Sequence, residues 1–258
     1  MALNEEEGDT ETSIESFQFI KEDQNHEDEV AIAEEQQQHY LPSIDLTLLI
    51  RQFPSQGISF KIWAAANALV TLLQQHHTQP NTSPLSPLLN SLPHPPRILE
   101  LGSGTGLVGI AASAILGAKV TITDLPNVLP NLQFNAAANL DVLKLNGGSV
   151  DVMSLRWGEV EDMESIGIVM YFDVVMGSDL VYHDTLYEPL LKTMQFFVGQ
   201  ERDVVFVMAH SRRWKKESGF FKKARKMFQV QTLHSEPPLP GDRIGIVVYS
   251  FARKLNNL

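Results

Sequence analysis

A glycine occupies every second position after an acidic residue in the run Glu100-Leu-Gly-Ser-Gly-Thr-Gly106. Apolar stretches at residues 97–101 and 107–116 flank this run, and they predict a strand followed by a helix. Because glycine has no Cβ, the turn between them can bring its backbone against a ligand. The unpaired N–H groups at the start of such a helix favour anionic groups. The run therefore predicts a cofactor site.

A second carboxylate follows the next predicted strand, residues 119–123. Asp124 lies about 20 residues beyond the glycines, where an acidic residue of a nucleotide-binding α/β unit binds ribose hydroxyls. We therefore expect Asp124 to bind the sugar of a nucleoside cofactor.

The glycine pattern matches the binding motifs of two cofactors. From Gly104 to Gly109 they read G-x-G-x-x-G, the dinucleotide fingerprint. From Glu100 the same residues read E-L-G-x-G-x-G, which is typical of S-adenosylmethionine enzymes. A carboxylate at Glu100 would repel the phosphates of NAD, whereas it would attract the ammonium and sulfonium of S-adenosylmethionine. We therefore expect S-adenosylmethionine, bound by a loop that contains Glu100, Gly102, Ser103 and Gly104.

Strands and helices are expected to alternate over most of the chain. A helix at 64–75 and a proline-rich surface loop at 78–96 come first. The expected strands are 97–101, 119–123, 149–155, 172–178 and 203–209, and the expected helices are 106–116, 127–139, 184–198 and 214–228. This alternation specifies a parallel sheet with helices on both faces, and residues 228–233 and 244–251 predict a closing antiparallel hairpin. Together they predict an α/β, Rossmann-like class I methyltransferase fold with a seven-stranded, mostly parallel sheet.

The charge of the chain is concentrated at one end. The 258 residues carry a net charge of −11 and are 43% hydrophobic, which is ample for one large domain. Residues 1–40 contain thirteen acidic residues against the single Lys21, a net charge of −12, so the remainder carries +1. The composition predicts a disordered acidic tail at 1–40 and one catalytic domain at 41–258.

Composition also limits location and partners. The chain has no cysteine, which excludes disulfides, cysteine zinc sites and thiol nucleophiles. The histidines lack metal-ligand spacing, no signal-peptide pattern is present, and no apolar run approaches the ~20 residues that span a bilayer. The basic stretch at 212–226 fits the solvated side of an amphipathic helix better than a nucleic-acid site. We expect a cytoplasmic or nuclear monomer without metal, membrane or nucleic acid.

Ligands of open α/β sheets bind beyond the carboxyl ends of the strands. This rule adds four candidates after the third and fourth strands, namely Trp157, Ser178, Asp179 and Tyr182. The indole of Trp157 offers a flat face to an adenine. The run Ser-Asp-Leu-Val-Tyr that ends at residue 182 contains no proline, although nucleic-acid amino methyltransferases commonly show an Asn-Pro-Pro-Tyr-like or Asp-Pro-Pro-Tyr-like run there. The missing prolines argue against a nucleic-acid base as the acceptor.

Over residues 57–252 the chain resembles the eukaryotic family-16 methyltransferases, which are seven-strand protein methyltransferases acting mostly on lysine. The resemblance rests on Trp63 and the alanines after it, residues 100–107, Thr123-Asp124-Leu125-Pro126, Asn135, Asn139, Leu155-Arg156-Trp157-Gly158 and Asp179-Leu180-Val181-Tyr182. It implies cofactor contacts from Trp63, Gly102 to Gly104, Asp124, Trp157 and Ser178. It also implies that Asp179 and Tyr182 border the opening for the acceptor side chain.

A carboxylate at Asp179 suits a lysine acceptor. Free lysine has a pKa of about 10.4 and is protonated at neutral pH, whereas methyl transfer needs a neutral amine. Asp179 can attract and orient the cation, desolvation and the sulfonium favour its deprotonation, and Tyr182 can line the channel. We therefore expect an S-adenosylmethionine-dependent protein-lysine N-methyltransferase with an intracellular protein as its substrate. The alternatives are a histidine, arginine or small-molecule acceptor, or a partner subunit that binds the cofactor without turnover.

Overall fold

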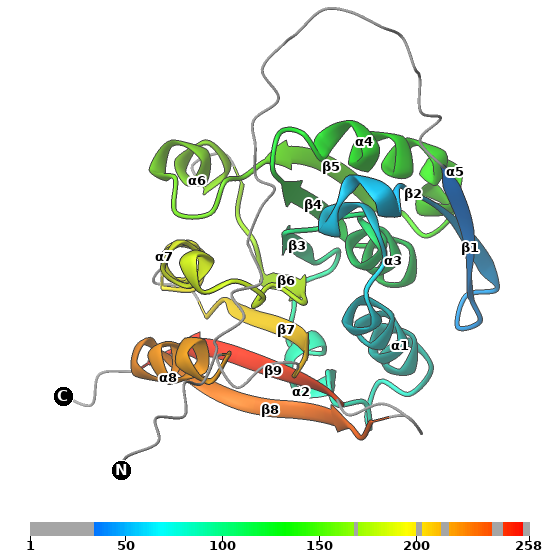
Figure 1. Cartoon of the computed structure of the whole chain (residues 1–258). Coiled ribbons are helices and arrows are strands. Elements are labelled where there is room, and N and C mark those ends of the chain that lie inside the picture. The colour runs from blue at the N-terminus through cyan, green and yellow to red at the C-terminus, as the bar shows by residue number, and fades with distance from the viewer. Residues whose placement is uncertain (1–33, 168–169, 200–202, 213–216, 239–244, 255–258) are drawn as a thin grey trace, which may run out of the picture. The chain divides into compact units, whose positions relative to one another are not determined.

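The computed structural model describes residues 34–167, 170–199, 203–212, 217–238 and 245–254. At its centre is a seven-stranded sheet in the order β5-β4-β3-β6-β7-β9-β8 (Figure 1). The strands are β3 Arg97–Leu101, β4 Lys119–Asp124, β5 Ser149–Ser154, β6 Val174–Ser178, β7 Val205–Ser211, β8 Phe228–Glu236 and β9 Ile246–Arg253. Strands β3 to β7 are parallel, and β9 runs antiparallel to both of its neighbours. The predicted fold class is confirmed.

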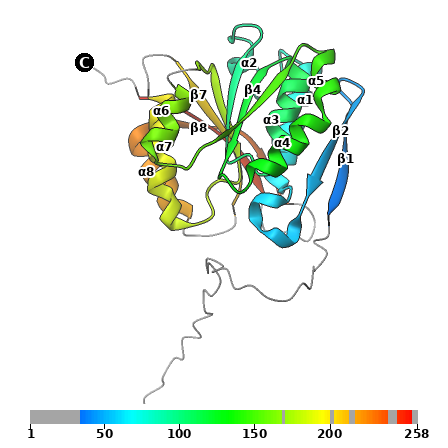
Figure 2. The ribbon, with the colours of Figure 1, turned by 90° about the horizontal axis from the view of Figure 1, so that it is seen from above.

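Helices cover both faces of this sheet, as Figure 2 shows. One face carries α1 Ala64–Thr78, α3 Leu107–Leu116, α4 Leu129–Ala138 and α5 Leu140–Leu145. The other carries α6 Val160–Gly167, α7 Tyr187–Val198 and α8 Ser218–Met227. Side chains alternate between the two faces of a strand, so Val174 and Met176 of β6 join the core under α1 and α3, and Val175 joins the core under α7.

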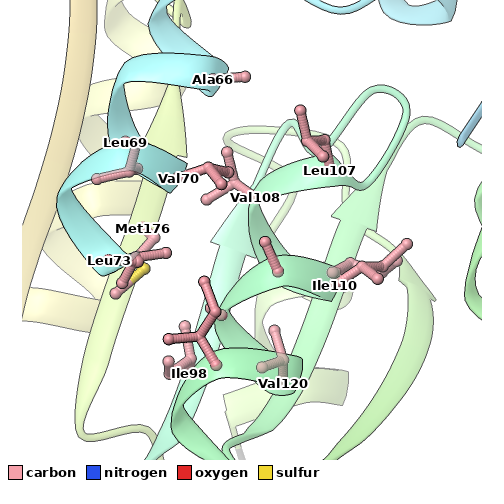
Figure 3. Close-up of a cluster of buried hydrophobic side chains, with 14 of the residues drawn as sticks. Ala66, Leu69, Val70, Leu73, Ile98, Leu107, Val108, Ile110, Val120 and Met176 are labelled. Atoms are coloured by element: carbon pink, nitrogen blue, oxygen red, sulfur yellow. The ribbon is translucent and has the colours of Figure 1, made fainter. Parts of the chain in front are cut away.

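The core between α1, α3 and the sheet is densely packed (Figure 3). Its labelled side chains come from three layers of structure, namely Ala66, Leu69, Val70 and Leu73 of α1, Leu107, Val108 and Ile110 of α3, and Ile98, Val120 and Met176 of the sheet. Gly109 allows α3 to approach this closely, because a Cβ there would lie 2.3 Å from Ile122 Cγ2 and 2.6 Å from Glu100 Oε2. The last glycine of the G-x-G-x-x-G pattern therefore serves helix packing.

A two-stranded hairpin corrects the predicted domain boundary. Strand β1, Glu35–Leu41, pairs antiparallel with β2, Leu46–Gln52. The strand thus begins before residue 41, inside the segment assigned to the acidic tail. Most of β1 is exposed and its sequence, EQQQHYL, lacks the apolar alternation of a half-buried strand. The tail prediction for residues 1–33 lies outside the described residues.

The connector at 78–96 is also more structured than a surface loop. It contains the short helix α2, Ser86–Leu89, with a proline in the first turn, where no N–H is needed. Leu85 and Leu89 of this connector are buried in the core. The prolines therefore exclude strand pairing, as expected, without keeping the segment out of the core.

Candidate active site

The turn after β3 has the backbone that its glycines predict. Gly102, Gly104 and Gly106 have φ values of +57°, +56° and +81°, which side chains disfavour. A Cβ on Gly102 would lie 2.8 Å from Cζ2 of Trp157, and one on Gly104 would lie 3.1 Å from the carbonyl oxygen of Ser59. The residues at 59 and 157 therefore border the bare backbone of the turn.

Ser103 fastens this turn to the next strand. Its N–H donates to the carbonyl of Thr123 at 2.9 Å, and its Oγ accepts from the N–H of Thr123 at 3.0 Å. The Thr123 hydroxyl in turn donates to the carbonyl of Glu100 at 2.7 Å. These bonds extend the contact between β3 and β4 beyond the ladder and give the turn a defined position.

Asp124 lies directly beside the glycine turn. Its two carboxylate oxygens accept from the N–H groups of Gly104 at 2.7 Å and Leu125 at 2.8 Å. Burial raises the pKa of Asp124, and the two N–H groups partly offset this effect. Burial and the charge of Asp124 also raise the pKa of Tyr182, whose side chain follows β6. The structure thus brings Asp124, Tyr182 and the turn to one edge of the sheet.

Glu100 points away from solvent. It is 1% exposed, and its Oε2 accepts from the N–H of Gly109 at 3.0 Å. Burial raises its pKa to about 8, so at neutral pH the folded protein holds mainly the uncharged acid. The structure therefore gives no support to the electrostatic choice of S-adenosylmethionine over NAD, which needs a charge at Glu100. A direct cofactor contact from this side chain stays a prediction.

The raised pKa makes stability depend on pH. Between pH 4.5, the ordinary value, and about 8 the folded protein holds a proton that the unfolded chain releases. The free energy of unfolding should therefore fall as pH rises through this range. Glu100→Gln keeps an oxygen for Gly109 and cannot ionise. We expect the variant to melt a few degrees higher than the natural protein at about pH 8.5, with a smaller difference near pH 6.

Thermal unfolding followed by circular dichroism measures this difference, with Glu164→Gln as the control. Glu164 lies exposed on α6, so its substitution should leave the pH dependence unchanged. A Glu100→Gln variant whose melting temperature declines as steeply as that of the natural protein would contradict the assignment.

Asp179 begins the segment after β6 in an unusual conformation. Its φ is +53°, a left-handed value that aspartate tolerates better than most residues. Its Oδ1 accepts from the N–H of Ser211 at 2.7 Å, and its Oδ2 accepts from the Ser211 hydroxyl at 3.1 Å. The carboxylate is thus fixed at the ends of β6 and β7. Ser178 is half-buried beside it, and Tyr182 is 44% exposed, with the rest of its side chain buried.

A buried histidine lies behind Asp179 and was missed by the sequence analysis. Nε2 of His210 lies 3.0 Å from Oε2 of Glu217, and Nδ1 lies 3.7 Å from Oδ1 of Asp179. All three side chains are less than one-tenth exposed. The rule of strand ends could have found His210, but the strand predicted at 203–209 ends two residues before the observed β7.

The two candidate tryptophans lie on different elements, Trp63 directly before α1 and Trp157 after β5. The indole Nε1 of Trp63 donates to the carbonyl of Ile58 at 2.9 Å, and Nζ of Lys61 lies 4.0 Å from the Trp63 ring centroid. The ring of Trp157 lies beside Gly102 and occupies the space that a Cβ at residue 102 would need. Each tryptophan is half-buried and can present a flat surface to a ligand.

Within the described ranges, no cluster of three or more histidine, aspartate or glutamate side chains could hold a metal ion. Likewise, no helix in the described part of the chain is long and apolar enough to cross a membrane.

The sheet order, the glycine turn after β3 and the acid after β4 define a class I methyltransferase. In fold the chain is similar to the T. Thermophilus 16S rRNA N2 G1207 methyltransferase RsmC, solved with AdoMet and guanosine. The TM-score is 0.51 at 16% identity, over 85% of this chain and 51% of that one. The family model described as lysine methyltransferase matches residues 43–227, most of the chain. The chain belongs to this lysine methyltransferase family.

Three relatives illustrate the range of similarity. Protein N-lysine methyltransferase METTL21A of Danio rerio is 36% identical over 138 residues, which is 54% of this chain and 60% of that one. Protein-lysine methyltransferase METTL21E of Mus musculus is 28% identical over 224 residues, 83% and 85% of the two chains. EEF1A lysine methyltransferase 3 of Xenopus tropicalis is 38% identical over 109 residues, 42% and 44%. The chain thus spans less than two thirds of the first and third relatives.

Proposed function

We propose that this protein transfers a methyl group from S-adenosylmethionine to the side-chain amine of a lysine in a protein substrate. The observation that carries the proposal is the juxtaposition, at one edge of the sheet, of a bare glycine turn with Asp124 and of a fixed carboxylate at Asp179. Family membership and the names of the relatives support the lysine acceptor.

The residues around the turn fit the cofactor. The backbone at Gly102 and Gly104 carries no Cβ that would obstruct a ligand. Asp124 offers a carboxylate to ribose hydroxyls, and the indoles of Trp63 and Trp157 offer flat surfaces. Ser178 lies at the end of the adjacent strand β6. When bound, S-adenosylmethionine supplies an electrophilic methyl group on its sulfonium.

Asp179 would bind and orient the acceptor. The two bonds from Ser211 fix the plane of the carboxylate at the ends of β6 and β7. Release of the amine proton, favoured by desolvation, makes the nitrogen nucleophilic. Alignment of amine and methyl then accounts for much of the acceleration, and such alignment contributes up to about 7–11 kcal/mol in favourable cases. The Tyr182 ring would line the acceptor channel.

The acceptor type can be tested directly. Protein labelled from radioactive S-adenosylmethionine is hydrolysed to amino acids, and the labelled species is identified by chromatography beside methyl-lysine, methyl-histidine and methyl-arginine standards. The proposal expects the label in methyl-lysine. Label in methyl-histidine, methyl-arginine or a small molecule would replace the lysine acceptor with that alternative. Cofactor binding without any transfer would favour a partner subunit without turnover.

We also propose that the protein is a monomer and that it is located in the cytoplasm, with the nucleus as the alternative location. The location is proposed because a chain without cysteine needs no oxidising compartment. Size-exclusion chromatography with light scattering and imaging of the tagged full chain test these two proposals.

A further inference from the structure

Three buried asparagines connect α4 to the N-terminal hairpin. Asn131, Asn135 and Asn139 recur every four residues, so they lie on one side of the helix. Each is at most 3% exposed. All three face β2, which lies beside α4 (Figure 1). Buried amides are costly unless every donor and acceptor is paired, so this row needs a partner along its whole length.

The amides pair with β2 as a neighbouring strand would. Oδ1 of Asn139 accepts from the N–H of Leu49 at 2.9 Å, and its Nδ2 donates to the Leu49 carbonyl at 2.8 Å. Asn135 pairs in the same way with the N–H and carbonyl of Arg51, at 2.8 and 3.1 Å. The outer edge of the hairpin is thereby held on the helix by side-chain amides.

One further bond distinguishes the two asparagines. Nδ2 of Asn135 also donates to the carbonyl of Thr105 at 2.8 Å, within the glycine turn. The corresponding bond of Asn139 goes to the carbonyl of Asn135 itself at 2.7 Å, inside the helix. Asn135 therefore connects β2 to the turn, and Asn139 does not.

The end of β2 also holds the segment that borders the turn on its other side. Oε1 of Gln52 accepts from the N–H of Ile62 at 2.7 Å. The N–H of Phe53, directly after β2, donates to the carbonyl of Phe60 at 2.8 Å. Both bonds fix residues 58–63, which include the Ser59 carbonyl beside Gly104. One strand thus contacts both the turn and the segment facing it.

We propose that β2 positions the cofactor site, and that Asn135 and Gln52 are the positioning residues through which it acts. The first holds the carbonyl of Thr105 and thereby the glycine turn, and the second holds residues 58–63 against that turn. The hairpin would then set cofactor affinity by fixing the two walls of the site in advance of binding. This inference rests on the proposed function, because it takes S-adenosylmethionine as the ligand of the turn.

Asn135→Ala and Asn139→Ala form a matched pair that tests the proposal. Each substitution removes three hydrogen bonds from one buried amide on the same helix face, so similar losses of stability are expected. Of the two substitutions, only Asn135→Ala removes a hydrogen bond to the glycine turn. Calorimetric titration with S-adenosylhomocysteine should show about tenfold weaker binding for Asn135→Ala, the equivalent of one hydrogen bond. Asn139→Ala should bind within about twofold of the natural protein.

Gln52→Ala provides a second test that does not depend on the folding of the asparagine variants. It removes the bond to Ile62 and should also weaken binding of S-adenosylhomocysteine. Gln37→Ala is its control, because Gln37 is exposed and contacts the same Gln52 amide from β1 at 2.9 Å. The control should bind as the natural protein does.

Two results would overturn the inference in different ways. If the natural protein binds S-adenosylhomocysteine and the two members of each pair bind it equally, the positioning role of β2 is wrong and the proposed function stands. If the natural protein shows no binding at all, the proposed cofactor fails, and the role of β2 fails with it.

Discussion

Asp179→Asn is expected to lower the rate of methyl transfer by about 100-fold, the cost of misplacing a reacting group by about 1 Å. The N–H of Ser211 donates to Asp179 at 2.7 Å in the natural protein, and the asparagine of the variant keeps an oxygen that can accept this bond. Asparagine also tolerates the φ of +53°. It removes the negative charge that attracts the lysine cation. Binding of S-adenosylhomocysteine should stay within about threefold, because the carboxylate belongs to the acceptor side of the site.

Steady-state kinetics and calorimetry on the same preparations separate these two effects. Asp45→Asn is the matched control, since Asp45 is the other non-glycine residue with a φ of +53° in the described structure, and it lies in the hairpin turn away from the sheet edge. The control should retain full activity. Equal and small losses in Asp179→Asn and Asp45→Asn would remove Asp179 from the mechanism.

Asp124→Ala should weaken cofactor binding by about 100-fold or more. The variant loses a charged acceptor for two ribose hydroxyls, and a hydrogen bond to a charged group contributes about 1.5–3 kcal/mol. It also leaves the N–H groups of Gly104 and Leu125 without the carboxylate that now fixes the turn. Calorimetric titration with S-adenosylmethionine and S-adenosylhomocysteine measures the loss for both ligands.

Asp173→Ala is the control for this measurement. Asp173 accepts three hydrogen bonds from Arg97 at the opposite, amino-terminal edge of the sheet. Its removal should lower the melting temperature and leave both dissociation constants unchanged. Unchanged binding in Asp124→Ala as well would show that the ribose lies elsewhere.

The parts of the fold that follow from apolar periodicity could be predicted from the sequence. Strands β3 to β7 each contain closely spaced apolar residues, which alternate with polar ones in β4 and at the start of β5. The predicted and observed strands differ by at most two residues at either end. Strand β1 could not be found this way, because its conformation depends on pairing with β2 rather than on its own polar sequence. Likewise, the burial of Leu85 and Leu89 depends on contacts distant in the chain.

For the site, the rule of strand ends placed the candidates at one edge of the sheet but could not give the direction of their side chains. Glu100 occupies a position that could have faced a ligand, yet the strand alternation and the close approach of α3 at Gly109 bury it. Asp179 engages Ser211, which lies 32 residues further along the chain. Such pairings depend on the register between strands, which no local pattern specifies.

The central claim is methyl transfer to a protein, and transfer of tritium from labelled S-adenosylmethionine into an extract of the source organism tests it most directly. The extract is incubated with the full chain or with Asp179→Asn, and the proteins are separated on a gel. We predict a discrete labelled protein band with the natural chain that is lost with the variant. A natural chain that binds the cofactor and labels no protein, or a band of equal intensity with Asp179→Asn, would contradict the account.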